Sequence, residues 1–510
     1  MSAGGAPRPP DAPDNSGRRG AAVEGADAGA ALGAGAASGA GAASGPRAGA
    51  GRQPGAGTPL RVDRPRRIRV LLLVLLGLIA ALAAALAVLA WLGTRDAAPT
   101  PSQSPAGSAD NQPATGGGAT TLIERGAYLA RIGNCLGCHT QAGGAPYAGG
   151  GPLVTPFGTF YGPNITPAVE TGIGKWSADD FWNALHNGRG QAGQLLYPAF
   201  PYPQYTHITR DDADAMFAYL RTVTPVEQPS QPHELAFPYR LRALLALWRG
   251  VYFRPAAPAV FDAGDGGAAT PAEVWRGRYL VEGLGHCAAC HSARNAWGAT
   301  ASPGSYGGGL IPGLDWYAPP LDGDPVVGLG RWSADDIAQL LHTGMSARGT
   351  AAGPMGEVVA TSTQYLAEAD ARAIAAYLKT IPAPPGNTRP PATAPQPALM
   401  QRGRELYRNQ CAQCHQEDGG GHPLAWPALA GNASVTAPDA RNAIRVVLEG
   451  GFAPATAFNP QPHGMPPFGQ ALSDADIAAV VTYIRNAWGN AAGPVSALEV
   501  KQARSSTALH

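Results

Sequence analysis

The longest apolar run in the chain lies near its start. From Val70 to Leu92 there are 23 residues without a charge, and a helix rising about 1.5 Å per residue could carry them across a bilayer core of roughly 30 Å. We therefore predict a transmembrane anchor over residues 70–92. The arginines just before it are Arg61, Arg64, Arg66, Arg67 and Arg69. By the positive-inside rule they keep the N-terminus in the cytoplasm, so the rest of the chain should lie in the periplasm of a bacterium.

A cleaved signal peptide is the alternative for this segment. Signal peptides have a shorter apolar core of about 7–15 residues and end in small residues. The sequence Trp91-Leu92-Gly93-Thr94-Arg95 is a poor cleavage site of that kind. The pattern therefore favours an uncleaved anchor in the cytoplasmic membrane.

Helical patterns then recur three times along the chain. Amphipathic opening helices begin at Arg125, Arg276 and Arg402. Closing helices, with apolar residues three and four apart and acidic residues in the first turn, begin near Asp211, Glu368 and Ser473. Three repeats of helical units predict a mainly α protein, built as three tandem domains behind the anchor.

The repeat sets the domain boundaries. We predict domains over residues 121–225, 270–385 and 398–490. The remaining segments are a low-complexity disordered tail (1–60), a flexible linker (96–120), a linker with an amphipathic helix (226–269) and a C-terminal tail (491–510). The amphipathic stretch LRALLALWRGVYF either packs on its own domain or faces the membrane or a partner subunit.

A phrase, WSADD, occurs in both of the first two units, at Trp176 and Trp332. Ser177 and Ser333 are placed to cap a helix there, with an aspartate three residues on. A capping serine needs no catalytic role, so these residues are interpreted as structural.

The net charge and the cysteine pattern exclude several classes of function. The net charge is +1 and no basic face interleaved with aromatic residues is present, so nucleic acid is not expected as a partner. All six cysteines fall in three Cys-X-X-Cys-His motifs. None remains for a disulfide framework or a four-cysteine zinc site.

Cys-X-X-Cys-His is the pattern of covalent haem attachment, with two thioether bonds to the porphyrin and the histidine on the iron. Three copies predict three haem c groups. The attachment residues would be Cys135, Cys138, Cys287, Cys290, Cys411 and Cys414. The proximal iron ligands would be His139, His291 and His415.

A sixth iron ligand is usually a methionine thioether, which raises the reduction potential. Met465, in the loop HGMPPFG before the third closing helix, is the candidate for the third haem. Met355 has the corresponding place in the second unit and is preferred to Met345. The matching loop of the first unit contains no methionine, which leaves His207 or an open position as alternatives.

From Leu122 to about Gln502 the chain resembles the multihaem cytochrome c subunit of bacterial membrane-bound alcohol, gluconate and aldehyde dehydrogenase complexes. The phrases that carry the resemblance are FGTFYGPNITPAVETGIGKWSADDF, GPMGEVVATSTQYL and HGMPPFGQALSDADIAAVVTYIRNAWGN. The chain departs from the family where the usual PAMPY reads Pro198-Ala199-Phe200-Pro201-Tyr202, and in its uncleaved anchor.

The resemblance implies an electron-transfer subunit without substrate chemistry of its own. Its partner would be a dehydrogenase catalytic subunit, either a quinoprotein, a flavoprotein or a molybdoprotein, and its acceptor ubiquinone or another respiratory acceptor. Two other classes stay open. One is a membrane-anchored cytochrome c shuttle that feeds a terminal oxidase; the other is an enzyme such as a dihaem-type peroxidase, which needs an open iron position.

Overall fold

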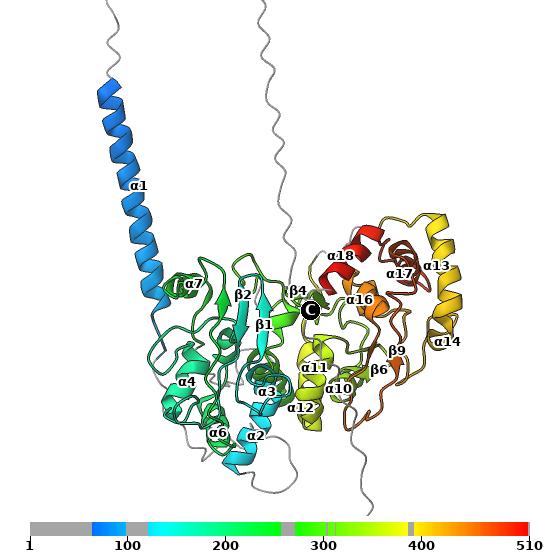
Figure 1. Ribbon diagram of the computed structural model, residues 1–510, viewed down its shortest axis with the longest axis horizontal. Coiled ribbons are helices and arrows are strands. Elements are labelled where there is room, and N and C mark those ends of the chain that lie inside the picture. Colours follow the sequence, from blue (N-terminus) through cyan, green and yellow to red (C-terminus); the bar gives the residue numbers. More distant parts are fainter. Residues whose placement is uncertain are drawn as a thin grey trace, which may run out of the picture. The chain divides into compact units, whose positions relative to one another are not determined.

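The structure is a computed structural model and describes residues 64–97, 121–256, 271–301, 304–311, 313–385 and 392–507. The predicted disordered tail over residues 1–60 lies outside these ranges, as does most of the predicted linker over residues 96–120. Helix α1 runs from Arg64 to Gly93 (Figure 1). Its segment Ile68–Gly93 is long and apolar enough to cross a membrane, so it is a candidate membrane anchor.

The three repeats form three mainly helical units, which confirms the predicted fold class. The first contains α2 (Leu122–Ile132), α3 (Cys135–His139), β1 (Pro152–Thr155), β2 (Gly158–Tyr161), α4 (Ala178–Asn187), α5 (Tyr202–Tyr205) and α6 (Arg210–Leu220), followed by β3 (Glu234–Leu235) and α7 (Leu244–Tyr252). The second contains α8 (Ala272–Arg278), the π-helix η2 (Tyr279–Leu284), α9 (Ala288–His291), β4 (Gly309–Ile311), β5 (Trp316–Ala318), α10 (Ala334–Thr343), β6 (Met345–Ser346), β7 (Gly349–Thr350), α11 (Pro354–Thr361), the 3-10 helix η3 (Thr363–Tyr365) and α12 (Glu368–Leu378). The third contains α13 (Pro397–Gln410), α14 (Ala412–His415), α15 (Ala433–Thr436), α16 (Arg441–Glu449), β8 (Gly451–Phe452), β9 (Gly464–Met465), α17 (Asp474–Asn486) and α18 (Ala497–Thr507). The strands pair antiparallel as β1-β2-β3, β4-β5, β6-β7 and β8-β9.

In every unit the opening helix crosses the closing helix at a glycine. A Cβ on Gly126 would lie 1.9 Å from the carbonyl oxygen of Ala215. In the second and third units the corresponding distances are 1.9 Å from Gly277 to Ala373 and 2.2 Å from Gly403 to Ala479. Only glycine lets the two backbones come this close. The Arg-Gly pair of each repeat therefore sets the helix crossing that leads into the Cys-X-X-Cys-His motif.

The capping serines are confirmed. Ser177 accepts from the backbone N–H of Asp180 while the Asp180 carboxylate accepts from the backbone N–H of Ser177, and Ser333 and Asp336 do the same at the start of α10. These reciprocal bonds satisfy backbone donors that the first turn of a helix leaves without a partner.

Two main cores hold the units together. The first is shared between the first two units, because buried residues of both contribute to one continuous cluster, including Leu129, Met216, Leu280 and Leu378. The third unit has a core of its own around α13, α16, α17 and α18. The first two units therefore form one packed module, and the third unit, with its own core, is attached to this module.

The predicted C-terminal tail over residues 491–510 is corrected by the structure. Residues 497–507 form α18, and its Val500 and Ala503 are buried in the third core. Ser506 Oγ also donates to the Asp315 carboxylate of the second unit at 2.6 Å. The helix completes the third unit, since it covers apolar positions that α16 and α17 would otherwise expose to water.

Candidate functional site

Each Cys-X-X-Cys-His motif lies on a short helix that follows the opening helix directly. In the first unit the chain turns into α3 through Asn134, whose φ is +53°, and in the second it turns through His286, whose φ is +38°. This sharp turn brings the motif back against the unit. All six cysteines are free thiols, so the motifs are not disulfides.

Five of the six motif thiols have a raised pKa. Burial, together with the second thiol of the pair, raises the pKa of Cys135 and of Cys287 to about 12, and that of Cys411 to about 11. Zinc sites and redox dithiols depend instead on thiolates with a lowered pKa. Within the described part of the chain, no group of three or more His, Cys, Asp or Glu side chains is placed to hold a metal ion. In the described residues, the cysteine pairs therefore lack the further ligands that a four-coordinate structural zinc site needs.

The histidine of each motif has a fixed ring. Its Nδ1 lies within hydrogen-bond distance of a proline carbonyl oxygen, at 2.7 Å from His139 to Pro163, 2.7 Å from His291 to Pro319 and 3.0 Å from His415 to Pro427. A carbonyl can only accept, so Nδ1 carries the proton and Nε2 keeps its lone pair. A histidine held in this way presents Nε2 to a metal.

Burial also lowers the pKa of these three histidines, although the proline carbonyl opposes the shift. The rings are therefore neutral at pH 7, as an iron ligand must be. A pair of thiols beside a neutral, oriented imidazole fits covalently attached haem in all three units. The chain's own residues thus supply attachment and the proximal ligand.

The methionine candidates differ in their surroundings. Met345 is buried in β6 and its sulfur accepts from Asn459 Nδ2 at 3.4 Å. Met355 lies in the first turn of α11 and is partly exposed. Met465 lies in β9 at the edge of the third core. Met355 stays the predicted ligand of the second unit.

The loop of the first unit that corresponds to the methionine loops contains Phe200 and no methionine. Phe200 packs against the shared core, with its ring centroid 5.4 Å from that of Tyr205. His207 lies beside the second unit, where a Cβ on Gly283 would be 3.4 Å from the His207 Cβ. His207 is exposed to solvent; desolvation by the surrounding chain lowers its pKa, and the nearby Glu282 opposes this. His207 is therefore a neutral side chain at the boundary of the two units.

A reciprocal arrangement links the first two units, and our sequence analysis missed it. Asp370 of the second unit accepts from Arg276 Nε of its own opening helix at 2.8 Å and from Tyr128 of the first unit at 2.5 Å. The mirror arrangement holds Asp212, which accepts from Arg125 at 2.7 Å and from Tyr279 at 2.5 Å. Both carboxylates are almost fully buried, at 2% and 1% exposure. A sequence signal did exist: tyrosine follows the arginine by three residues in both opening helices.

The three units contact one another in series. The Cys138 thiol lies close enough to Cys290 and to Glu357 for their charges to raise its pKa, after the larger effect of burial. The third unit reaches the second through its β8–β9 loop, where Asn459 bonds Met345 and Phe458 stacks on His342. The second unit is thus the middle one of the three.

A family model described as cytochrome c matches residues 123–224, 276–382 and 400–488. The chain belongs to the cytochrome c family. A cytochrome c carries covalently bound haem c, which agrees with the thiols and histidines described above.

Relatives of this cytochrome c extend over most of its length. The cytochrome c subunit of alcohol dehydrogenase (quinone) from Gluconacetobacter polyoxogenes is 41% identical over 401 residues, which cover 76% of this chain and 84% of the relative. The gluconate 2-dehydrogenase cytochrome c subunit from Pantoea cypripedii is 40% identical, over 75% of this chain and 89% of the relative. A diheme cytochrome c-type protein from Cereibacter sphaeroides is 37% identical over 278 residues, which cover 52% of this chain and 88% of the relative.

Proposed function

We propose that this cytochrome c is the electron-transfer subunit of a membrane-bound dehydrogenase. It would accept electrons from a catalytic subunit in the periplasm and pass them through three haem c groups to ubiquinone or another respiratory acceptor. The observation that carries the proposal is the threefold occurrence of one site, with two thiols and a histidine whose Nδ1 meets a proline carbonyl. The names of its relatives supply the class of partner.

Each unit would hold one haem through its own motif. The thioether bonds would come from Cys135 and Cys138, Cys287 and Cys290, and Cys411 and Cys414. Bound haem supplies a one-electron iron couple. The protein keeps the imidazoles of His139, His291 and His415 neutral through desolvation, and the proline carbonyl that accepts from Nδ1 fixes which nitrogen carries the proton.

For the sixth positions we propose Met355 in the second unit and Met465 in the third. In the first unit we propose His207, for lack of a methionine in the loop that contains Phe200. A first haem with two nitrogen ligands would have a lower potential than two haems with a thioether ligand. Electrons would then run downhill from the first unit toward the methionine-ligated haems.

The order of contacts supports a relay. The first and second motifs share a boundary at Cys138 and Cys290, and the third unit's β8–β9 loop packs on the second unit. Each unit thus touches the next one in the proposed relay. The anchor segment Ile68–Gly93 would hold the relay at the membrane, where a lipid-soluble quinone is found.

Purification of the native complex tests this function. After gentle detergent extraction, we expect the haem-stained complex to contain a large catalytic subunit with a quinone-type, flavin or molybdenum cofactor, and its substrate to reduce the haems. Recovery of the cytochrome alone or with a terminal oxidase would contradict the proposal and assign it as a shuttle.

The haem count has its own test. Replacing Cys287 and Cys290 by alanine should remove one third of the covalent haem in a pyridine haemochrome assay, and so should the matched replacement of Cys411 and Cys414. A pair whose loss leaves the haem content unchanged would contradict three attachment sites.

A further inference from the structure

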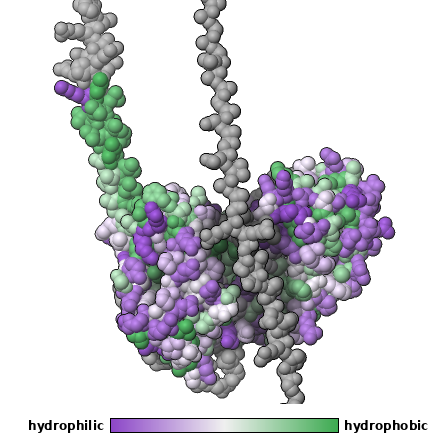
Figure 2. Space-filling view, viewed as in Figure 1, coloured by the Kyte–Doolittle hydropathy of each residue, from purple (hydrophilic) through white to green (hydrophobic). Residues whose placement is uncertain are grey.

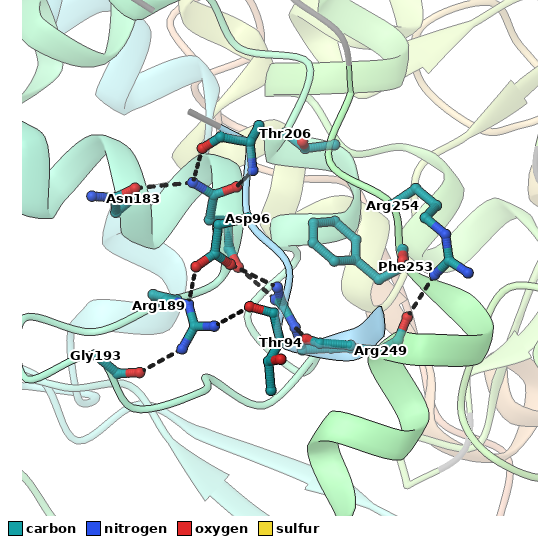
Figure 3. A network of polar contacts seen from close by, with 12 residues as sticks. Thr94, Asp96, Asn183, Arg189, Gly193, Thr206, Arg249, Phe253 and Arg254 are labelled. Carbon is teal, nitrogen blue, oxygen red and sulfur yellow. Dashed lines mark hydrogen bonds and ion pairs between the residues drawn. The ribbon is translucent and has the colours of Figure 1, made fainter. Parts of the chain in front are cut away.

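Helix α7 is joined to the end of α1 by a buried arginine (Figure 3). Arg249 is 1% exposed, and its Nε donates to the carbonyl oxygen of Gly93, the last residue of α1, at 2.7 Å. The same guanidinium donates to the Asn187 carbonyl and to Asp96. Arg189 also pairs with Asp96. One network thus ties α7, the end of α1 and the first unit together.

The two helices touch through their backbones. A Cβ on Gly250 would lie 2.0 Å from the carbonyl oxygen of Leu89, and a Cβ on Gly93 would lie 1.8 Å from that of Ala246. Two glycines facing each other's helix allow such an approach, which any side chain would prevent. Helix α7 therefore crosses the last turn of α1 at a fixed place.

That place corresponds to the surface of a bilayer. The apolar segment Ile68–Gly93 has 26 residues and is about 39 Å long, whereas the hydrocarbon core is roughly 30 Å thick. With the basic N-terminal side at the other surface, the last turn around Leu89 and Gly93 falls in the interfacial layer. Whatever packs against that turn lies at the same depth.

The outer face of α7 is apolar. Leu244 and Val251 lie seven residues apart on one side of the helix and are 39% and 54% exposed, whereas Leu245 and Arg249 on the other side are buried. Phe237, in the loop that leads into α7, is 71% exposed. Figure 2 shows the hydrophobic surface of α1 continuing onto the surface beside its base.

The charged side chains of α7 and its flanking residues are all basic. Between Leu235 and Ala256 there are four arginines and no acidic residue. Arg249 is buried, which leaves the exposed Arg240, Arg242 and Arg254 to reach the headgroups. Apolar and aromatic side chains beside arginines are typical of helices that lie in the membrane interface, where the rings sit at headgroup level and the guanidinium groups meet phosphates.

We propose that α7 and the loop before it, Phe237–Ala243, form a second membrane contact that lies flat in the lipid headgroup layer beside α1. The occupant of the apolar face is the bilayer that α1 crosses, because α7 packs on α1 at the interfacial turn and its surface continues that of α1. The inference rests on the anchoring role of α1 in the proposed function. The contact would fix the orientation of the first unit above the membrane rather than leave it swinging from a single helix.

Photo-crosslinking of the full haem-loaded chain in lipid nanodiscs tests the contact. The probe is a phosphatidylcholine with a diazirine in its acyl chain, mixed with roughly one third phosphatidylglycerol as anionic lipid. Mass spectrometry should find lipid adducts on residues 237–252 as well as on α1. Adducts on α1 without adducts on residues 237–252 would overturn the inference.

Variants sharpen the test. Leu244→Glu with Val251→Glu should lower the adduct yield on residues 237–252 at least about fivefold, because carboxylates partition poorly into lipid. Leu498→Glu, at an exposed leucine of the third unit, should change nothing. An undiminished yield in the double variant would contradict the proposed face.

Two further outcomes distinguish failure of the α1 anchor from failure of the α7 contact. Absence of adducts on α1 itself would remove the anchor and the inference with it, while haem content and reduction by substrate would still report on the proposed function. Loss of adducts on residues 237–252 when the catalytic subunit is added would assign the face to a protein partner and overturn lipid as its occupant.

Discussion

The reciprocal tyrosines should hold the first two units together. Tyr128→Phe removes the hydroxyl that donates to Asp370 at 2.5 Å and accepts from the backbone N–H of Ala367 at 3.1 Å. Tyr279→Phe removes the matching donor to Asp212, and the acceptor of the Thr209 N–H. Each change leaves the ring in place, so packing in the shared core is kept and only the polar contacts are lost.

The expected magnitude follows from burial and charge. A hydrogen bond to a charged group contributes about 1.5–3 kcal/mol, and each carboxylate keeps its arginine partner, so no unpaired buried charge results. We expect each variant to lower the free energy of unfolding of the paired module by about 2 kcal/mol. Arg276 of one network lies over the Tyr279 ring of the other, so the losses of the two single variants should not add exactly in the double variant.

Guanidinium unfolding monitored by circular dichroism measures this effect. The transition of the first two units should shift to lower denaturant, while that of the third unit should stay in place because its core is separate. Tyr365→Phe is the matched control, since it removes a hydroxyl from a 44% exposed ring and should cost less than about 0.5 kcal/mol. If Tyr128→Phe and Tyr279→Phe both behave like this control, the reciprocal contacts do not stabilise the module.

Three further changes should have distinct effects. Gly403→Ala places a Cβ 2.2 Å from the Ala479 carbonyl oxygen and should destabilise the third unit by about 2–3 kcal/mol in thermal unfolding. The control is Gly307→Ala, whose Cβ would meet nothing nearer than 4.0 Å. It should change the free energy of unfolding by less than about 0.5 kcal/mol. Met465→His should lower one midpoint potential in a redox titration by on the order of 0.1 V or more, because axial ligands tune haem potentials over about 0.8 V; unchanged potentials would exclude Met465 as a ligand. The Ser473 hydroxyl and Arg402 hold the pKa of Asp476 below its usual value of 3.8. The ionised Asp476 carboxylate therefore stabilises the third unit at pH values above 3.8. This stabilisation is lost as the pH falls through the lowered pKa. Asp476→Asn should therefore flatten the acid limb of the third unit's stability and cost about 0.5 kcal/mol or less at pH 7, given its exposure to solvent; an unaltered acid limb would contradict this.

Features that depend on local sequence were predicted well. The charge-free run of residues 70–92 corresponds to α1, and the third closing helix, expected from Ser473, begins at Asp474 with Ser473 as its cap. Helix caps and apolar periodicity act within a few residues, so the order of residues along the chain is enough to find them. The Cys-X-X-Cys-His motif is equally local.

Features that depend on contacts between distant segments were not predicted. Helix α18 was taken for a tail because its eleven residues have a weak apolar stripe, and only the third core explains why Val500 is buried. The proline carbonyls that orient the motif histidines lie 12 to 28 residues away in the chain. The backbone contact of Gly93 with α7 joins residues about 150 positions apart, which no local pattern encodes.

The reciprocal bonds relate one sequence position of each repeat to the pairing of its unit with a neighbour. Where a unit is paired, the third residue after its opening arginine is tyrosine, and the N3 aspartate of its closing helix is sealed from water. In the third unit that residue is Glu405, and the corresponding Asp476 is left with 25% of its side chain in solvent. A carboxylate at this place could not donate to a second aspartate and would repel it. In this chain, Arg-Gly-X-Tyr therefore occurs in the two units that share a core and exchange buried tyrosine–aspartate bonds, and Arg-Gly-X-Glu occurs in the third unit, whose core is its own.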